Sequence, residues 1–252
     1  MNSLKEWYFG PGPEPSITSL SARDLQNIYP LQRNLDQKFS AFIDLLECKK
    51  NSFNFGQEVK SDGALFVGEG NLSFSLSVAK QASVEASNIV ATTLETSNLL
   101  SKETLKNATS LRQLGARVLH GVDATRLSDR LAKRSYGLIV FQFPNVGSRS
   151  PIYGRNPNHI LLRRFLRNAT PYLGRSGTVA ITIVNTPFYL GAFNLPELAR
   201  IAGFKEPEIY PFRPKDFPKY RHTNTHGPDS AISRYHTFST WVLRPKASAK
   251  AW

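Results

Sequence analysis

Short apolar runs alternate with helical patterns along most of this 252-residue chain. The runs at 137–143 (GLIVFQF) and 178–184 (TVAITIV) are apolar almost throughout, which is typical of central strands buried on both faces of a sheet. Because nearly every strand up to the sixth precedes a helical pattern, the sequence predicts an α/β fold with a Rossmann-like, doubly wound sheet of seven mostly parallel strands and an antiparallel terminal pair. Strands are expected at 63–68, 88–94, 117–120, 138–143, 178–184, 206–211 and 234–243, and helices near 72–83, 101–115, 126–134, 158–173 and 192–202.

The alternating pattern begins only after about 60 residues, so we predict an N-terminal helical extension over 1–60 and a Rossmann-like domain over 61–252. The extension has a Pro-rich opening and two expected helices. The first is capped by Ser21, and the second runs over 35–48. We expect the extension to pack over the functional site or on a basic face.

The segment 65–80, LFVGEGNLSFSLSVAK, joins the first expected strand to a helix through a tight turn. Gly68 and Gly70 lack the β-carbons that would keep a ligand away from the backbone at the carboxyl end of that strand. The turn therefore resembles a nucleotide cradle, although a plain strand-to-helix turn is the alternative. A dinucleotide fingerprint would have a third glycine where this chain has Ser73, so S-adenosylmethionine is favoured over NAD.

Two further acids follow successive expected strands. Glu95 ends the second apolar run at the spacing of a ribose-binding carboxylate, and Asp123 follows the third, where it could accept a hydrogen bond from an adenine amino group. Each acid alone has a structural alternative, since Asp123 could instead cap the helix after it. Together with the glycine turn they favour an adenosine-bearing ligand.

These segments resemble the large-subunit ribosomal RNA (uridine-N3) methyltransferase-like domains, whose members open with a similar VGEGNFSFS turn. The resemblance continues in LHGVDATRL, IVFQFPNVG, NPNHILLRRFLRNATPYL and FPKYRHT, and covers roughly residues 62–243. It implies a class I methyltransferase with S-adenosylmethionine as cofactor. In this interpretation the amino-acid end of the cofactor is held by Gly68, Glu69, Gly70 and Asn71.

The loop after the fourth expected strand should stand beside the methyl group, because ligand crevices lie outside the carboxyl ends of strands. In the resemblance, FQFPNVG holds a flat acceptor, which makes Gln142, Pro144 and Asn145 candidate catalytic residues. Phe143 would stack on the base or fill the core. Family members commonly read FNFPHxG, so Gln142 and Asn145 depart from that pattern.

A second loop on the same side, 211–229, is long, basic and aromatic. Methylation of uridine N3 requires its proton to leave, so a group that accepts the proton or stabilises the anion is expected nearby. His222, His226 and Asp216 are the candidates, with a bystander role as the alternative for His222. The loop-forming residues around the two histidines argue against a metal site.

The net charge of +13 is concentrated in the second half of the chain. Residues 1–129 carry 13 Lys or Arg and 14 Asp or Glu, whereas residues 130–252 carry 19 and 5. Such a surface attracts polyanions, and interleaved aromatic residues favour nucleic acid over a solvated basic face without a partner. The candidate RNA-binding residues are Arg149, Arg155, Arg163, Lys219, Tyr220 and Arg221.

Cys48 is the only cysteine, which excludes an internal disulfide and cysteine-based metal or iron–sulfur sites. It also disfavours a methylation mechanism that needs a nucleophilic thiol beside the base. The chain opens without a secretory signal and contains no apolar run of membrane-spanning length, so we expect a cytoplasmic protein without a membrane partner.

These patterns together predict an S-adenosylmethionine-dependent methyltransferase that acts on RNA, and the resemblance implies that the acceptor is a base nitrogen, uridine N3 of ribosomal RNA. Two alternatives remain open: a small-molecule methyltransferase with the same cradle, and a binding module that retains the cradle without turnover.

Overall fold

A computed structural model of the chain describes residues 49–60, 62–131, 135–148, 150–152, 155–223, 235 and 237–246. One seven-stranded sheet forms its centre, in the order β3-β2-β1-β4-β5-β7-β6. Strands β1 to β5 are parallel to one another, and β7 is antiparallel to both β5 and β6. This arrangement confirms the predicted doubly wound sheet and its antiparallel terminal pair.

The strands occupy the apolar runs that the sequence marks out, because a run without polar side chains is stable only where both sheet faces are covered. All four residues of β1 and of β2 are buried. The strands are β1 Ala64–Val67, β2 Ile89–Thr92, β3 Arg117–Leu119, β4 Tyr136–Gln142, β5 Leu173–Val184, β6 Glu208–Pro211 and β7 Phe238–Leu243.

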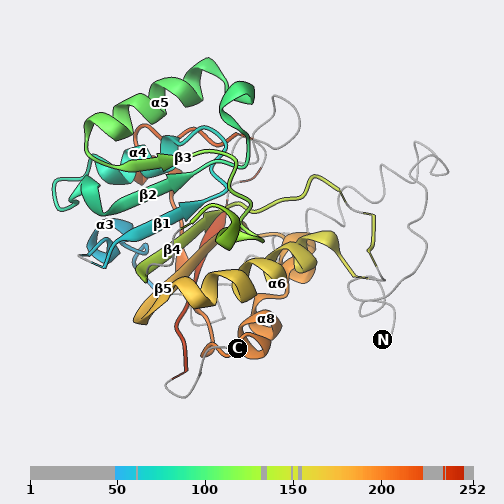
Figure 1. Cartoon of the computed structure of the whole chain (residues 1–252). Helices are drawn as coiled ribbons and strands as arrows, with labels where there is room; N and C mark the ends of the chain where they lie inside the picture. Colours follow the sequence, from blue (N-terminus) through green and yellow to red (C-terminus); the bar gives the residue numbers. More distant parts are fainter. Residues whose placement is uncertain are drawn as a thin grey trace, which may run out of the picture.

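Helices cover both faces of the sheet, with α4 and α5 on one side and α6 and α8 on the other (Figure 1). The α-helices are α3 Phe55–Glu58, α4 Ser73–Ala79, α5 Lys102–Gln113, α6 Pro157–Ala169, α7 Pro187–Phe193 and α8 Leu195–Ile201. Short 3-10 turns lie at η2 Ala86–Asn88, η3 Ser97–Leu99, η4 Leu127–Asp129, η5 Thr170–Tyr172 and η6 Pro214–Asp216. Every helix among these residues is too short or too polar to cross a membrane.

Two expected helices differ from the structure. The helix expected near 192–202 is split into α7 and α8 by Asn194, whose φ is +45°. Asn tolerates this left-handed conformation, and Pro196 is favourable in the first turn of a helix, so the chain starts a new helix there. Over 126–131 the chain forms only the 3-10 turn η4, and residues 132–134 lie outside the described part.

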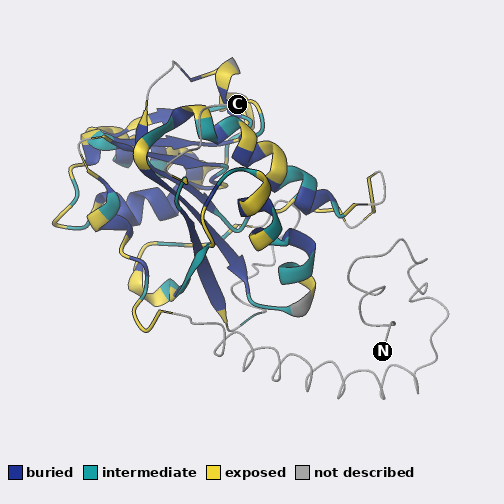
Figure 2. Cartoon of the chain, turned by 90° about the horizontal axis from the view of Figure 1, so that it is seen from below, coloured by how far each residue is buried: buried dark blue, intermediate teal, exposed yellow. Residues whose placement is uncertain are grey.

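The core has two layers, one on each face of the sheet, and buried residues follow the strands and the inner faces of the helices (Figure 2). The layer beneath α4 is rich in aromatic rings. Phe53 and Phe55 belong to it, although both precede residue 61, and the Phe55 ring contacts Phe74 with centroids 5.0 Å apart. Residues 49–59 are therefore packed against the sheet domain, while the expected helices of the extension and Cys48 lie outside the described residues.

Candidate active site

The turn after β1 requires glycine at its first position. Gly68 has φ of +62°, and a β-carbon placed there would lie 2.6 Å from the ring of Phe141. The turn is held to the neighbouring strand because the Glu69 amide donates to the Thr92 carbonyl at 3.0 Å. The backbone of 68–71 is thus fixed at the carboxyl edge of the sheet, as the sequence predicts for a ligand cradle.

The Glu69 carboxylate is buried and points to the start of α4. It accepts hydrogen bonds from the Ser75 amide at 3.0 and 3.2 Å and from the Ser75 hydroxyl at 2.7 Å. Burial raises the pKa of Glu69 to about 7, although the hydrogen bonds from Ser75 oppose that shift. The side chain therefore caps the start of α4.

Part of the late basic loop lies against this turn. We call residues 217–223 the strap. Its aromatic side chains pack into the core layer beneath α4: the ring centroids of Phe217 and Tyr220 lie 4.8 and 5.2 Å from that of Phe74. Burial, and the nearby charge of Glu69, raise the pKa of Tyr220 well above its usual value. Tyr220 was expected to stack on RNA, whereas its ring lies within the protein's aromatic cluster.

The strap backbone is hydrogen-bonded to side chains of the turn. The Ser73 hydroxyl donates to the Arg221 carbonyl at 3.0 Å and accepts from the Arg221 amide at 2.9 Å. The Asn71 amide donates to the same carbonyl at 2.9 Å. A β-carbon at Gly70 would lie 3.2 Å from Thr223. Ser73, read from the sequence only as a missing glycine, is thus the anchor of a segment 148 residues away, which no local pattern reveals.

Gln142 lies directly beside the glycine turn. Val67 of β1 is in register with Phe141 of β4, so Gly68 and Gln142 follow side by side at the same sheet edge. The amide nitrogen and oxygen of Gln142 are both buried, and neither has a hydrogen-bond partner among the described residues. A buried amide without partners costs folding free energy, and a bound ligand or water can complete its pairing.

Phe143 follows with a strained backbone, since its φ is +47°. Its ring contacts Phe212, His222 and Phe238 edge-on at 5.7, 5.0 and 5.5 Å. The core alternative for Phe143 is therefore the one observed. Burial lowers the pKa of His222 to about 4, so this imidazole is neutral at pH 7 and a weak proton acceptor.

The rest of the loop after β4 is fixed by local hydrogen bonds. Pro144 is buried, and the exposed Asn145 accepts from the Gly147 amide at 2.9 Å, which closes a turn. Asn158, at the start of α6, accepts from the Val146 amide at 2.9 Å. Asn158 was not singled out from the sequence; its only signal is the Asn-Pro helix start before it.

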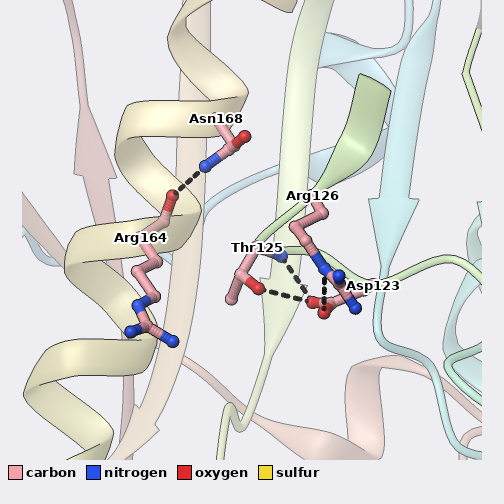
Figure 3. Close-up of polar contacts among 5 residues, drawn as sticks. All are labelled: Asp123, Thr125, Arg126, Arg164 and Asn168. Atoms are coloured by element: carbon pink, nitrogen blue, oxygen red, sulfur yellow. Dashed lines mark hydrogen bonds and ion pairs between the residues drawn. The ribbon is translucent and has the colours of Figure 1, made fainter. Parts of the chain in front are cut away.

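The two acids after β2 and β3 differ in their environment. The Glu95 side chain is exposed and makes no hydrogen bond within the described part of the chain, while its carbonyl accepts from Gly121. Asp123 accepts from the Thr125 amide at 2.8 Å and hydroxyl at 2.7 Å, and forms an ion pair with Arg126 at 3.4 Å (Figure 3). Partial burial raises the pKa of Asp123, but these hydrogen bonds outweigh it and leave the pKa below its usual value. The structural alternative for Asp123 is thus observed, although its carboxylate closes a turn and does not cap a helix.

The candidate RNA-binding side chains that the structure describes lie at the surface, except Tyr220. Arg155, Arg163, Lys219 and Arg221 are exposed. Arg164 is exposed on the same helix as Arg163, where its carbonyl accepts from Asn168 (Figure 3). Arg149 and His226 lie outside the described residues, within which no three potential metal ligands gather.

The strand order, the inserted antiparallel β7, the glycine turn after β1 and the acids after β2 and β3 define a class I S-adenosylmethionine-dependent methyltransferase. A family model described as "rRNA (uridine-N3-)-methyltransferase BTM5-like" matches residues 65–224, from β1 to just past the strap. The chain belongs to this BMT5-like family, and its class of activity is S-adenosylmethionine-dependent RNA methylation.

Two Arabidopsis thaliana proteins are similar in sequence. An uncharacterized protein is 33% identical over 168 residues, which cover 62% of this chain and 78% of that protein. The heavy metal-associated isoprenylated plant protein 41 is 32% identical over 176 residues, which cover 65% of this chain but only 33% of that protein. Among solved structures, the 16S rRNA methyltransferase KamB matches with a TM-score of 0.45 and 14% identity, over 78% of this chain and 95% of that chain.

Proposed function

We propose that this chain transfers a methyl group from S-adenosylmethionine to N3 of a uridine in ribosomal RNA. The observation that carries the proposal is the buried, unpartnered amide of Gln142 beside the glycine turn. The description of the family supports the choice of base and of RNA. A donor bound on the turn would place its methyl group at the same sheet edge as the Gln142 amide.

The residues present fit this donor. Gly68 and Gly70 let the turn pack closely against Phe141 and Thr223, and the exposed Glu95 carboxylate would accept hydrogen bonds from ribose hydroxyls. Glu69 and Asn71 would act by fixing the turn, because their side chains are engaged with Ser75 and the strap. Asp123 would add one more carboxylate for the adenine amino group, beside its role in the turn.

The amide of Gln142 is matched to the charge that develops on a uracil. The N3 proton passes to solvent water before the base is enclosed, negative charge then spreads to the two carbonyl oxygens beside N3, and the Gln142 amide can donate to one of them. Phe143, Pro144 and the neutral His222 would form a wall that keeps water away from the base. The donor, when bound, supplies a methyl group activated by its sulfonium, so no nucleophile of the protein is needed.

RNA would be held by the exposed basic residues. Arg155 and Arg163 lie on the loop after β4 and on α6, and Lys219 and Arg221 lie on the strap. Contacts to phosphates release counterions, so RNA binding should weaken steeply as salt rises. An acceptor that binds without salt dependence would favour a small-molecule substrate instead.

The proposal is tested by methyl transfer in vitro. The full chain is incubated with tritiated S-adenosylmethionine and unmodified large-subunit ribosomal RNA, and the digested RNA is separated against N3-methyluridine, C5-methyluridine and 2′-O-methyluridine standards. Label in N3-methyluridine is expected. Label only in another nucleoside overturns the assignment of the acceptor atom, and donor binding by calorimetry without any transfer overturns the enzyme and supports a binding module.

A further inference from the structure

The strap touches the two halves of the proposed activity at once. On its inner side, its backbone is hydrogen-bonded to Asn71 and Ser73 of the glycine turn, and Thr223 lies against Gly70. On its outer side, Lys219 and Arg221 expose their charged ends. A segment of seven residues therefore links the donor cradle to side chains suited to phosphates.

The aromatic side chains of the strap pack into the core, so the strap does not open and close over the site. Phe217 is 6% exposed, and its ring stacks on that of Phe212 with centroids 5.4 Å apart. Tyr220 is held edge-on against Phe74. Lifting the strap would expose these rings, which opposes opening. A donor that enters the cradle must therefore contact the turn while the strap is in place.

The outer side of the strap carries two exposed basic residues, Lys219 and Arg221. Partial burial, together with the charge of the nearby Lys219, lowers the pKa of Lys80. Both lysines are exposed, and Arg221 lies two residues along the strap. Like charges held close together favour an anion, and the phosphates of RNA supply one.

We propose that the strap couples the two binding events, so that occupation of the donor site tightens RNA binding, with Ser73 as the positioning residue. The inference rests on the proposed function and adds an energetic link to it. Contacts of a donor with the glycine turn stabilise the arrangement in which Ser73 holds the strap backbone, and hence the positions of Lys219 and Arg221 at the phosphates. By linkage, RNA must tighten donor binding by the same factor.

The test compares RNA affinity with and without S-adenosylhomocysteine, the product that cannot react. Fluorescence anisotropy of a labelled single-stranded oligouridine gives the RNA affinity of the full chain in each state, and calorimetry gives the affinity for the product. We expect the product to tighten RNA binding by about fivefold or more in the wild-type chain. Ser73→Ala removes both hydrogen bonds of the hydroxyl to Arg221, and should bring this ratio close to one.

Two variants separate the effect of the hydrogen bonds between Ser73 and Arg221 from the effects of neighbouring groups. Ser77→Ala changes a buried serine one turn further along α4. The Ser77 hydroxyl makes no hydrogen bond to the described residues, so this variant should keep the wild-type ratio. Arg221→Ala keeps the backbone hydrogen bonds to Ser73 but loses one of the two phosphate contacts through which the donor would act, so RNA binding should weaken more with the product bound than without it. A ratio of one in the wild type, a ratio below one, or an unchanged ratio in Ser73→Ala would each overturn the coupling. Absence of product binding would instead overturn the proposed function itself.

Discussion

The donor side and the acceptor side of the proposed site lie at the ends of the neighbouring strands β1 and β4, and their polar side chains differ in hydrogen bonding. On the donor side, the side chains of Glu69, Asn71 and Ser73 are all hydrogen-bonded within the protein. On the acceptor side, the Gln142 amide is buried without a partner and Phe143 has a strained backbone. The polar side chains of the donor turn are thus paired within the protein. The acceptor side has an unpaired amide and a strained backbone, and a bound base can lower their cost in folding free energy.

The largest expected effect concerns Gln142. Gln142→Leu replaces the unpartnered amide with an apolar side chain of similar size, so the free energy of unfolding should rise by about 1–3 kcal/mol. The methyl-transfer rate should fall by about 100-fold or more, because one donor to the developing charge is lost. Chemical denaturation and the tritium assay measure the two effects.

Thr182→Val is the matched control on the neighbouring strand. Thr182 is in register with Gln142, but its hydroxyl is hydrogen-bonded to Thr240 at 2.9 Å. Its removal should lower stability by about 1 kcal/mol and leave transfer unchanged. A Gln142→Leu variant that is less stable than the wild type would show that its amide already has a partner, and the contrast between the two sides would disappear.

On the donor side, the sharpest change is Gly68→Ala. The substitution combines a positive φ with a β-carbon 2.6 Å from the Phe141 ring, so we expect a loss of about 2–4 kcal/mol of stability. Gly115→Ala is the control, since Gly115 also has a positive φ but its nearest neighbour would lie at 3.7 Å. It should cost about 1–2 kcal/mol. Equal losses in thermal or denaturant unfolding would show that the contact with Phe141 does not matter.

Features of this site that depend on residues close together in the sequence could be predicted, whereas contacts between residues far apart in the sequence could not. The strands and the glycine turn are encoded locally, in apolar runs and in Gly68, and the structure confirms them. The strap is not, because its anchor joins Ser73 to Arg221 across 148 residues of sequence. Tyr220 shows the same limit: an aromatic residue in a basic loop suggests RNA stacking, but only the packed fold reveals Phe74 beside it.

The next prediction concerns two titrating groups, one on each side, whose pKa values shift in opposite directions. Glu69 has a pKa of about 7 in the folded protein against an ordinary value of 4.5, so its contribution to stability is present below pH 4.5 and is lost as pH rises to 7. His222 has a pKa of about 4 against 6.5, so its contribution is present above pH 6.5 and is lost as pH falls to 4. Each contribution amounts to about 3 kcal/mol at most.

Between pH 4.5 and 6.5 these two slopes oppose one another in the wild type. Glu69→Gln should therefore make stability rise with pH relative to the wild type over that window, and His222→Gln should make it fall. Denaturant unfolding at a series of pH values measures both differences. Two variants with parallel pH profiles would contradict the opposite environments of the two groups.

The smallest expected effect, at Asp123, decides whether a residue already used within the protein also serves the donor. Asp123→Ala should weaken binding of S-adenosylmethionine by about tenfold, the worth of one hydrogen bond to a charged group, and also loosen the turn that it caps. Thr125→Val removes the hydroxyl bonded to Asp123 but keeps the carboxylate. That control should lose stability and keep its donor affinity in calorimetry. If Asp123→Ala also keeps its affinity, Asp123 is only a turn residue, and the adenine must be recognised by other groups at the ends of β2 and β3.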